Sequence, residues 1–449
     1  MSSDFDKLEH TVVGLERGGQ VIVLDNGALI DSEAEAMLQA LHSRSVGGLM
    51  HHLNILKAKG AGNFISNFYV GYGHKSIGDC GSTTVFIEGV SMLAAKAIQD
   101  SPLYSGQEAS TRYIDFSGQP LIDPTQTEEG RKLLETQRSF YLDAQKPTRE
   151  DLRHKYPIGD GEDSVVYEKA INARAFDITR SLLPAGASTN LAWHTNLRQA
   201  ADKLLFLRHH PLPEVRKIAE GLEQALAVHH PNSFTHKRYE ATEFYQDLIA
   251  ADSFYHNPHA SDTVTVCFDK IDFKEIEKHR KLFDQRPPKT ELPKYLSQAG
   301  ILDVQFQLDY GSFRDIQRHR ALVQRMPFLT QDLGFNSWYV ENLPGEIAGR
   351  LPDHLGNIKD GVAALNIFPE EQQYFLPMGY NTSNKFTGDL PATVYMVELR
   401  DSRFVHPTLQ KVAHEIGRQI GDRLRIPLHV DSQPSRFDIG RGKHDIVLK

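Results

Sequence analysis

A strand pattern followed by a helix pattern occurs in both halves of the chain, and this repetition restricts the possible folds more than any other feature. Residues 83–87 are β-branched or aromatic, and apolar residues then recur at helical spacing over 90–98. In the second half, residues 304–308 alternate as a strand does, and 313–325 follow as a helix. Longer helical patterns come later in each half, at 166–182, 189–229 and, after an irregular start, 377–420. Because 449 residues suffice for two mid-sized domains of one kind, we predict an internal duplication.

The remaining segments fit around this repeat. Residues 21–24 read as a strand, and Asp31 and Ser32 are N-cap candidates for the helix that follows. The polar stretch 117–165 is typical of a surface excursion, and the segment 230–262 of a junction. After the junction, a strand at 263–268 and a helix at 273–283 restart the pattern.

Composition excludes several classes of protein. Lysine and arginine number 50 against 58 acidic residues, a net charge of −8, which argues against a general nucleic-acid coat. Two distant cysteines, Cys80 and Cys267, provide neither a disulfide scaffold nor a zinc ribbon. The adjacent histidine pairs have poor geometry for a metal, so we expect no metal site. The start of the sequence lacks a signal-peptide pattern and no apolar run could span a membrane, so we expect a soluble cytoplasmic protein.

The densest polar cluster is residues 105–113, just after a predicted helix end. Gly106 permits close approach of the backbone, and Arg112 could grip a phosphate with two hydrogen bonds. Glu108 could accept a hydrogen bond from a nucleobase N–H. The alternative is a capped, solvated loop.

A second cluster is basic and spans two helical turns. Arg318, His319 and Arg320 follow Arg314 and Asp315 closely. Like charges at this spacing repel one another, which favours an anionic partner such as a pyrophosphate or a reduced flavin. The alternative is a solvated basic face with pairing along the helix.

The two clusters together resemble the signature of the flavin-dependent thymidylate synthases (ThyX), R-H-R-x-x-S-x-N-E-x-S-x-R-Y. The first cluster keeps the second half of the signature in register as Ser105, Glu108, Ser110, Arg112 and Tyr113, with Gln107 for the asparagine. Asp100, Ser101 and Pro102 stand where R-H-R is expected. The second cluster keeps R-H-R at 318–320 and replaces the rest with Val323, Arg325, Met326, Phe328, Thr330 and Gln331. Each copy is degenerate in the half that the other keeps.

Further motifs of the family follow in both halves. Residues 73–76, Gly-His-Lys-Ser, resemble the flavin loop G-H-x-S/T, with Asp79 where a glutamate is usual. Residues 180–184 resemble A-R-x-x-L-P, and 196–198 resemble the N-L-R of the flavin site. Arg208 resembles the arginine of L-x-L-R but lies one residue too far along. In the second half, Gln373 replaces the arginine before Leu376-Pro377, and Asp389-Leu390-Pro391 replaces N-L-R. Arg400 matches the arginine of L-x-L-R at the family's spacing.

The resemblance implies an α+β fold of two ThyX-like α/β domains in tandem, each with a small antiparallel or mixed sheet and long helices. The first copy is residues 1–235 and the second is 236–449. It also implies bound FAD, transfer of a methylene from methylenetetrahydrofolate to C5 of dUMP to give dTMP, and NADPH as reductant. Because the family is tetrameric with sites at subunit interfaces, we expect a homodimer with composite sites that combine the two copies.

The resemblance also assigns roles to residues. Arg400, Ser110 and Arg112 are the expected catalytic residues, Arg400 by polarising the uracil carbonyl. The expected substrate-binding residues are Ser105, Glu108, Ser110, Arg112, Tyr113, Arg180, Arg318 and Arg400. The expected cofactor-binding residues are His74, Ser76, Asn196, Arg198, Arg318, His319 and Arg320. Two alternatives stay open: another flavin-dependent modification at C5 of a uracil nucleotide, and a non-catalytic relative that binds nucleotide or a partner protein.

Overall fold

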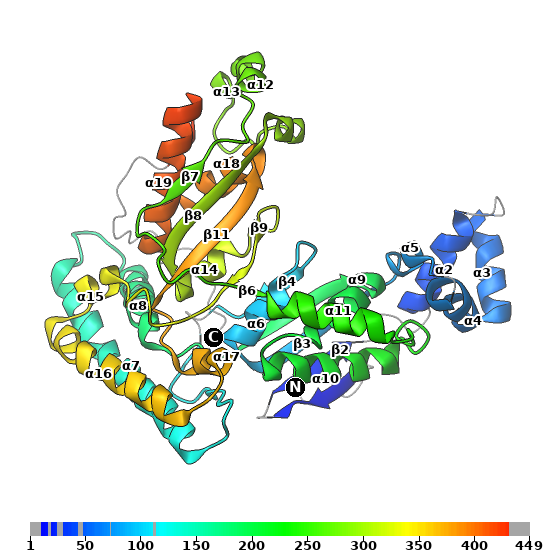
Figure 1. Ribbon diagram of the computed structural model, residues 1–449, viewed down its shortest axis with the longest axis horizontal. Coiled ribbons are helices and arrows are strands. Elements are labelled where there is room, and N and C mark those ends of the chain that lie inside the picture. Colours follow the sequence, from blue (N-terminus) through cyan, green and yellow to red (C-terminus); the bar gives the residue numbers. More distant parts are fainter. Residues whose placement is uncertain are drawn as a thin grey trace. The chain divides into compact units, whose positions relative to one another are not determined.

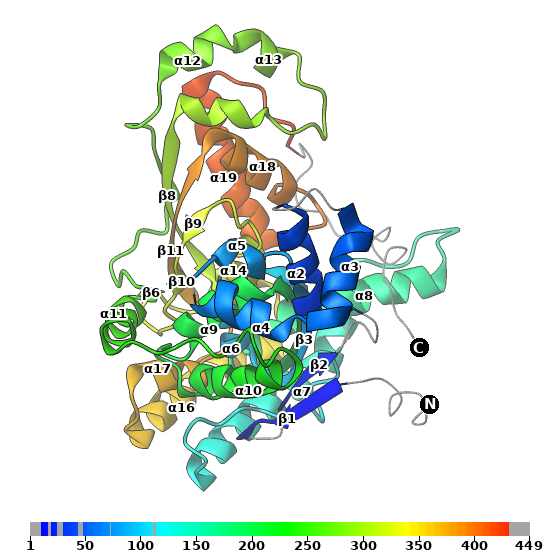
Figure 2. The ribbon, with the colours of Figure 1, turned by 90° about the vertical axis from the view of Figure 1, so that its right-hand side faces the viewer.

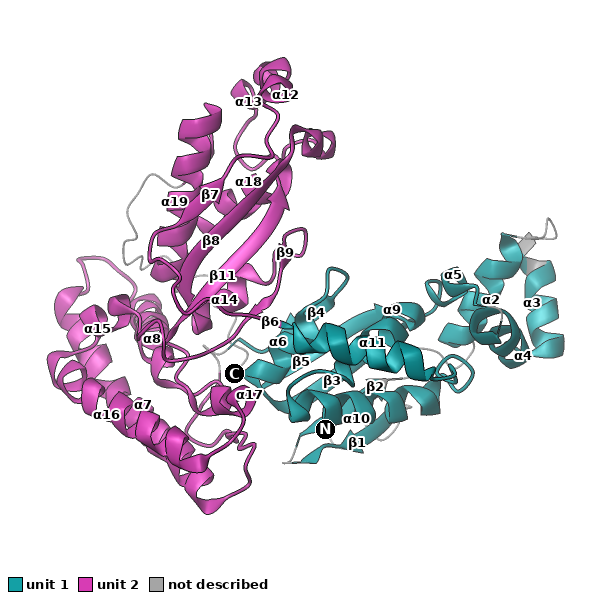
Figure 3. Cartoon of the chain, in the orientation of Figure 1, with its two compact units in different colours: residues 1–111, 188–253 teal, residues 112–187, 254–449 magenta. Residues whose placement is uncertain are grey.

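The computed structural model describes residues 10–16, 19–24, 30–43, 48–71, 73–110 and 114–430 (Figure 1). The chain forms two compact units (Figure 3). Unit 1 comprises residues 1–111 and 188–253, and unit 2 comprises 112–187 and 254–449. The units therefore do not coincide with the predicted copies, because a copy is defined by order along the chain and a unit by contacts. The predicted boundary between residues 235 and 236 stays a prediction.

Unit 1 is built on a five-stranded antiparallel sheet with the strand order β1-β2-β3-β5-β4. Its strands are β1 (His10–Gly14), β2 (Gln20–Leu24), β3 (Ser82–Ser91), β4 (Ser105–Glu108) and β5 (Ser188–Asn196). Helices α6 (Met92–Gln99), α9 (Leu197–Leu207) and α10 (Pro213–His229) pack against the sheet. Every residue of α6 is buried, which places this helix in the core of the unit.

A smaller helical group completes unit 1. It contains α2 (Ser32–His42), α3 (Gly48–Lys59), α4 (Gly62–Phe64), the π-helix η2 (Ile65–Gly71) and α5 (Lys75–Gly78). Its own small core includes Ile65, Tyr69 and Ile77. Helix α11 (Glu240–Ala251) lies at the end of the unit and contacts α9.

Unit 2 contains a four-stranded antiparallel sheet with the order β7-β8-β11-β9. Its strands are β7 (Thr265–Cys267), β8 (Ile301–Asp309), β9 (Val323–Gln324) and β11 (Asn381–Asp389). Helices α14 (Tyr310–Ile316), α18 (Leu390–Arg400) and α19 (Pro407–Leu424) pack on it (Figures 1 and 2). At its edge lie α12 (Phe273–Lys278), α13 (Arg280–Asp284) and η5 (Lys294–Ala299).

Long helices form a second layer of unit 2. They are α7 (Glu128–Lys155), α8 (Ser164–Thr179), α15 (Ser337–Asn342), α16 (Gly345–Leu365) and α17 (Pro369–Gln372), with the 3-10 turns η4 (Arg180–Leu182) and η6 (Gln373–Phe375). A parallel pair, β6 (Phe254–Tyr255) and β10 (Met326–Pro327), contacts strand β11 of the sheet. Phe140 of α7 stacks on His354 of α16, with ring centres 4.0 Å apart. Segments from both halves of the sequence thus build one core.

The two sheets share an order of elements. In unit 1, β3 is followed by α6 and β4, and β5 is followed by α9 and α10. In unit 2, β8 is followed by α14 and β9, and β11 is followed by α18 and α19. β5 and β11 each have nine residues, and α9 and α18 each have 11. A bulge between Ile87 and Val90, with Gly89 at a φ of +66°, gives β3 one residue more than β8. An internal duplication would give both units this shared order of strands and helices. The duplication itself stays a prediction.

The mixed helix and sheet composition with small antiparallel sheets confirms the coarse fold class. The strands at 21–24, 83–87 and 304–308 are confirmed as parts of β2, β3 and β8. Asp31 is the N-cap of α2, and its Oδ1 accepts from Ala34 N at 2.7 Å. No helix in the described ranges is both long and apolar enough to cross a membrane.

Five element predictions are wrong. Residues 189–196 are not helical: they form β5, whose residues Leu191, Trp193 and Thr195 alternate inward at the period of a strand. The predicted surface excursion at 117–165 contains the 28-residue helix α7, which buries Leu134, Phe140, Tyr141 and Leu152 although most of its residues are polar. The helix predicted at 313–325 ends at Ile316, and 377–420 begins with strand β11. Half of the first polar cluster is strand β4, not a loop.

Candidate functional site

The predicted site residues fall into both units. His74, Ser76, Ser105, Glu108, Ser110, Asn196 and Arg198 lie in unit 1, and Arg180, Arg318, His319, Arg320 and Arg400 lie in unit 2. Arg112 and Tyr113 lie outside the described residues. Arg180 comes from the first half of the sequence, yet it is in the same unit as the R-H-R residues of the second half.

In unit 2, the ends of two helices bring Arg400 and His319 together. Arg400 is the last residue of α18, and His319 follows the end of α14. The Arg400 Nε donates to His319 Nε2 at 2.8 Å, and its Nη2 donates to the backbone carbonyl of Asp315 at 2.9 Å. His319 is buried, whereas Arg318 and Arg320 are exposed. A guanidinium held at two of its nitrogens presents a fixed group to the rest of the site.

Arg180 is buried against the other end of α14. Its Nη2 donates to Ser312 Oγ at 3.1 Å. Ser312 Oγ also lies 3.2 Å from His406 Nδ1 and 2.9 Å from Thr408 Oγ1. Asp309, the N-cap of α14, accepts from the Tyr339 hydroxyl at 2.7 Å. Burial acts against the charge of Arg180, but Tyr339, Asp177 and Asp309 outweigh it, so its pKa is raised above the usual value.

Asp315 lies among the arginines of this cluster. Its Oδ1 is 3.8 Å from Arg318 Nε and 3.9 Å from Arg400 Nη1. Burial opposes ionisation, but Arg400, Arg318, Arg180 and Arg314 outweigh it and lower the pKa of Asp315. Burial, and then the charge of Arg400, lower the pKa of His319 to about 3, so its ring is neutral at physiological pH. We call Arg180, Asp315, Arg318, His319 and Arg400 the arginine cluster.

Sequence reasoning missed the residues that hold Arg180. Ser312, Tyr339 and His406 were not predicted, and no motif marks them as partners of a residue more than a hundred positions away. One local signal was present: Asp309 ends a strand and Ser312 follows three residues later, which is an N-cap pattern.

In unit 1, the loop that resembles the flavin loop lies beside the N-L-R segment. Arg198 Nε donates to Asp79 Oδ1 at 2.6 Å, and Lys75 Nζ donates to Asp202 Oδ1 at 3.0 Å. Asn196 is the N-cap of α9, and its Oδ1 accepts from Gln199 N at 2.8 Å. His74 and Ser76 are exposed on the same loop. The structure therefore places side by side the two segments that carry the four unit 1 residues expected to bind the cofactor.

The β4 segment has a structural role in addition to the one expected of it. The Glu108 carboxylate is 2.6 Å from Lys96 Nζ, and both side chains are almost fully buried. Gln99 Nε2 also donates to Glu108, at 3.0 Å. A Cβ on Gly106 would lie 1.9 Å from the carbonyl oxygen of Ala192, so the close backbone approach expected here is to β5. Ser105 and Ser110 are exposed.

In unit 1, a buried lysine contacts the segment where R-H-R is missing. Lys203 Nζ donates to the carbonyl oxygen of Asp100, the residue that stands for the first arginine of R-H-R, at 2.7 Å. Burial lowers the pKa of Lys203 to about 8. Arg400 in unit 2 makes a similar contact: Lys203 reaches from α9 to the end of α6, and Arg400 reaches from α18 to the end of α14.

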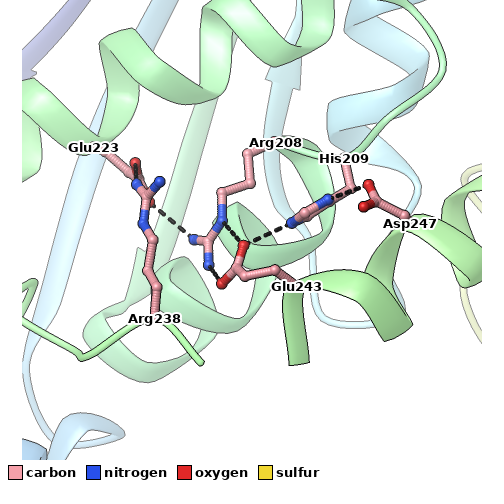
Figure 4. A network of polar contacts seen from close by, with 6 residues as sticks. All are labelled: Arg208, His209, Glu223, Arg238, Glu243 and Asp247. Carbon is pink, nitrogen blue, oxygen red and sulfur yellow. Dashed lines mark hydrogen bonds and ion pairs between the residues drawn. The ribbon is translucent and has the colours of Figure 1, made fainter. Parts of the chain in front are cut away.

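Arg208, the residue one position too far along, belongs to a network of ion pairs (Figure 4). Helix α9 ends at Leu207, whereas its counterpart α18 ends at Arg400, so Arg208 lies one residue beyond the position equivalent to Arg400. Its guanidinium contacts Glu223 at 3.0 Å and also Glu243. His209 lies between Glu243 and Asp247, at 2.7 and 2.5 Å. These contacts join α9 to α10 and α11.

Comparisons with known proteins agree with the motifs. Residues 30–232 match the family model described as thymidylate synthase complementing protein. A UPF0159 protein of Chlamydia pneumoniae is 25% identical over 416 residues, covering 80% of this chain and 78% of that protein. A UPF0159 protein of Chlamydia muridarum is 26% identical with the same coverage. One of Thermoplasma acidophilum is 24% identical, covering 89% of this chain and 93% of its own. The similarity to these relatives runs through both halves of the chain.

Proposed function

We propose, from the premise that residues 30–232 belong to the thymidylate synthase complementing protein family, that this protein is an FAD-dependent enzyme of thymidylate synthesis. The reaction is transfer of a methylene from methylenetetrahydrofolate to C5 of dUMP, followed by reduction, which gives dTMP. NADPH is the proposed reductant of the flavin. The specific reaction and reductant go beyond the family match, which supports an enzyme of the thymidylate synthase type.

One observation carries the proposal: the arginine cluster gathers family residues from both halves of the sequence. Arg180 lies inside the segment that matches the family, whereas Arg318, His319 and Arg400 lie outside it. Arg180 donates to Ser312 Oγ and Arg400 donates to the Asp315 carbonyl, so both side chains lie against helix α14. Three guanidiniums, of which only that of Arg318 is exposed, with the half-buried carboxylate of Asp315 among them suit a ligand that is an anion with polar carbonyls.

Each residue of the cluster has a task that its contacts suit. Arg180 and the exposed Arg318 supply positive charge for the nucleotide phosphate. Arg400 stabilises negative charge that develops on the uracil carbonyl. Neutral His319 accepts from Arg400 and fixes the plane of its guanidinium. Because the imidazole is neutral, it adds no charge that would compete with Arg400.

The residues expected to bind the cofactor are chemically suited to a flavin dinucleotide. Lys75 and Arg198 place two cations beside the exposed His74 and Ser76, a donor set that fits an anionic dinucleotide. His74, Ser76, Asn196 and Arg198, together with Arg318, His319 and Arg320, are the proposed FAD residues. When bound, FAD supplies the hydride, and the protein contributes position and electrostatic field.

We further propose that the chain is a tandem duplication that acts as a homodimer. The pairing of β4 with β5, Ser105 opposite His194, corresponds to that of β9 with β11, Val323 opposite Thr387. This correspondence, and the complementary loss of motif halves, support two copies of one domain. In the dimer, Ser105, Ser110, Arg112 and Tyr113 complete the substrate site, and the opposite combination of degraded halves is inactive.

The test is spectroscopic and then enzymatic. The purified protein, reconstituted with FAD if needed, should be yellow and should bleach on addition of NADPH. With dUMP and methylenetetrahydrofolate, it should form dTMP, measured by chromatography, and the gene should support growth of a thymidine auxotroph. A protein that cannot take up FAD would contradict any flavin enzyme and leave the non-catalytic relative. Bleaching without dTMP would instead indicate another C5 modification, for which Gln107 and Asp79 are the departures from the family pattern.

A further inference from the structure

Arg180 is as buried as Arg286 but has a different kind of partner. The exposed fractions of the two residues are 7% and 8%. Arg286 pairs with the carboxylate of Glu398 through two of its nitrogens. Arg180 instead donates to the neutral hydroxyl of Ser312 at 3.1 Å, and no carboxylate in the described ranges forms an ion pair with it. A buried guanidinium whose contact partner is neutral keeps its charge for an anionic ligand.

The Ser312 hydroxyl is fixed by the start of helix α19. Its Oγ lies 3.2 Å from His406 Nδ1 and 2.9 Å from Thr408 Oγ1. His406 Nε2 lies 3.2 Å from the carbonyl oxygen of Asp177, which only accepts, so in the singly protonated ring Nε2 carries the proton and Nδ1 accepts. Ser312 Oγ can therefore donate to His406 while it accepts from Arg180. A chain of hydrogen bonds thus leads from the Asp177 carbonyl through His406 and Ser312 to the guanidinium.

One tyrosine holds both the His406 ring and the backbone of Ser312. The rings of Tyr339 and His406 have centres 5.5 Å apart. The Tyr339 hydroxyl donates to Asp309 Oδ2 at 2.7 Å, and the same oxygen accepts from Ser312 N at 2.9 Å. None of these four residues is more than 2% exposed. Because buried polar side chains with several partners have little freedom to change rotamer, the hydroxyl that Arg180 contacts keeps one position.

We propose that Ser312 and His406 are positioning residues for the nucleotide phosphate, because they orient the guanidinium of Arg180 that contacts it. The inference rests on the proposed function, which assigns Arg180 to the phosphate of dUMP. Neither Ser312 nor His406 touches the nucleotide. A contact through two hydrogen bonds between a guanidinium and a phosphate depends on the plane of the guanidinium. Loss of the Ser312 hydroxyl therefore lowers the affinity for the phosphate even though the charge of Arg180 is kept.

The test compares dUMP with deoxyuridine, which lacks the phosphate, in calorimetric titrations of the full-length protein. In the variant Ser312→Ala, dUMP should bind about tenfold more weakly, as expected for a hydrogen bond to a charged group. Deoxyuridine should bind as it does to the unaltered protein. Since the phosphate is bound equally in the ground state and the transition state, KM for dUMP should rise while kcat changes by less than about twofold.

Ser383→Ala is the matched control. Ser383 is also a buried serine of unit 2, and its hydroxyl accepts from the backbone N–H of Asn257 at 2.8 Å. Its loss should leave the affinity for both ligands unchanged. If Ser312→Ala weakened dUMP and deoxyuridine by the same factor, the effect would be a general disturbance of the site, and the inference would be overturned. Melting temperatures check that all variants are folded.

A double-variant cycle tests whether Ser312 acts through Arg180. Arg180→Gln alone should weaken dUMP binding by at least about tenfold. Adding Ser312→Ala should cause no further loss, because the group that Ser312 orients is gone. An equal loss from Ser312→Ala with and without Arg180 would also overturn the inference.

The variant His406→Asn tests the more distant member of the chain of hydrogen bonds. His406 caps α19, and asparagine can still cap the helix, but the imidazole between Ser312 and Asp177 is lost. Binding of dUMP should weaken by about threefold, with deoxyuridine again unaffected. A protein that forms dTMP but binds dUMP equally well without the Ser312 hydroxyl would overturn this inference and leave the proposed function intact. A folded, unaltered protein that binds no dUMP would overturn both.

Discussion

The Nε of Arg400 donates a hydrogen bond of 2.8 Å to Nε2 of His319, a residue 81 positions earlier in the sequence. Since Nε2 accepts, the neutral ring carries its proton on Nδ1. His319 therefore acts on Arg400 as a positioning residue. The chemistry proposed for the site depends on a fixed guanidinium, and this bond provides the fixation.

Replacing Arg400 by lysine should reduce dTMP formation about 100-fold, which is typical of losing a donor that stabilises developing charge. Lysine keeps the charge but cannot hold both His319 and the Asp315 carbonyl in one plane. Turnover of dUMP is the measurement, with Arg418→Lys as the control. Equal loss in both variants would remove the special role of Arg400.

Acidification should destabilise unit 2 well above the range in which carboxylates titrate. The folded-state pKa of His319 is about 3 and the unfolded value about 6.5, so between these values the unfolded chain binds more protons. Stability is therefore lost as the pH falls below about 6.5, at up to about 1.4 kcal/mol per pH unit for this group. Buried His210, with a pKa lowered to about 3, adds a similar loss in unit 1.

The variant His319→Gln isolates this contribution, because glutamine can accept from Arg400 but does not titrate. Its melting temperature should fall less steeply than that of the unaltered protein between pH 7 and pH 5. Parallel curves for the two proteins would mean that His319 is not protonated on unfolding in this range.

The variant Gly106→Ala should destabilise unit 1 by about 1–3 kcal/mol, the usual cost of forcing an extra methyl into a packed site. The new Cβ would lie 1.9 Å from the carbonyl oxygen of Ala192, so β4 must move away from β5. At Gly118 a Cβ meets nothing within 4 Å, and Gly118→Ala should change stability by less than about 0.5 kcal/mol. Thermal or urea unfolding measures both.

The variant Glu108→Ala should destabilise the protein by about 3–5 kcal/mol, because it leaves the buried Lys96 ammonium without this carboxylate. The double variant Lys96→Met/Glu108→Leu should recover most of that loss, since apolar side chains of similar size can replace a buried pair. Denaturant unfolding separates this structural role from ligand binding. If the single variant were as stable as the unaltered protein while nucleotide affinity fell, Glu108 would be a binding residue only.

Features that depend on neighbouring residues could be predicted from the amino-acid sequence. The capping of α2 by Asp31, the alternation of β8 and the two halves of the signature could all be read within a few positions. The family resemblance came from such local motifs, and the match over residues 30–232 agrees with it. Local patterns predict the wrong element where the spacing of a helix and the spacing of a strand overlap. Strand β5 is such a case, because the local pattern there indicates a helix.

Which distant residues meet depends on the tertiary structure. Arg180 donates to Ser312 across 132 positions, and Arg400 donates to His319 across 81. These partners depend on strand register and helix packing, which set the positions of whole elements and leave no mark on the residues nearby. The sequence could therefore name the arginines of the site, but the fold was needed to assign Arg180, Arg400 and His319 to one unit.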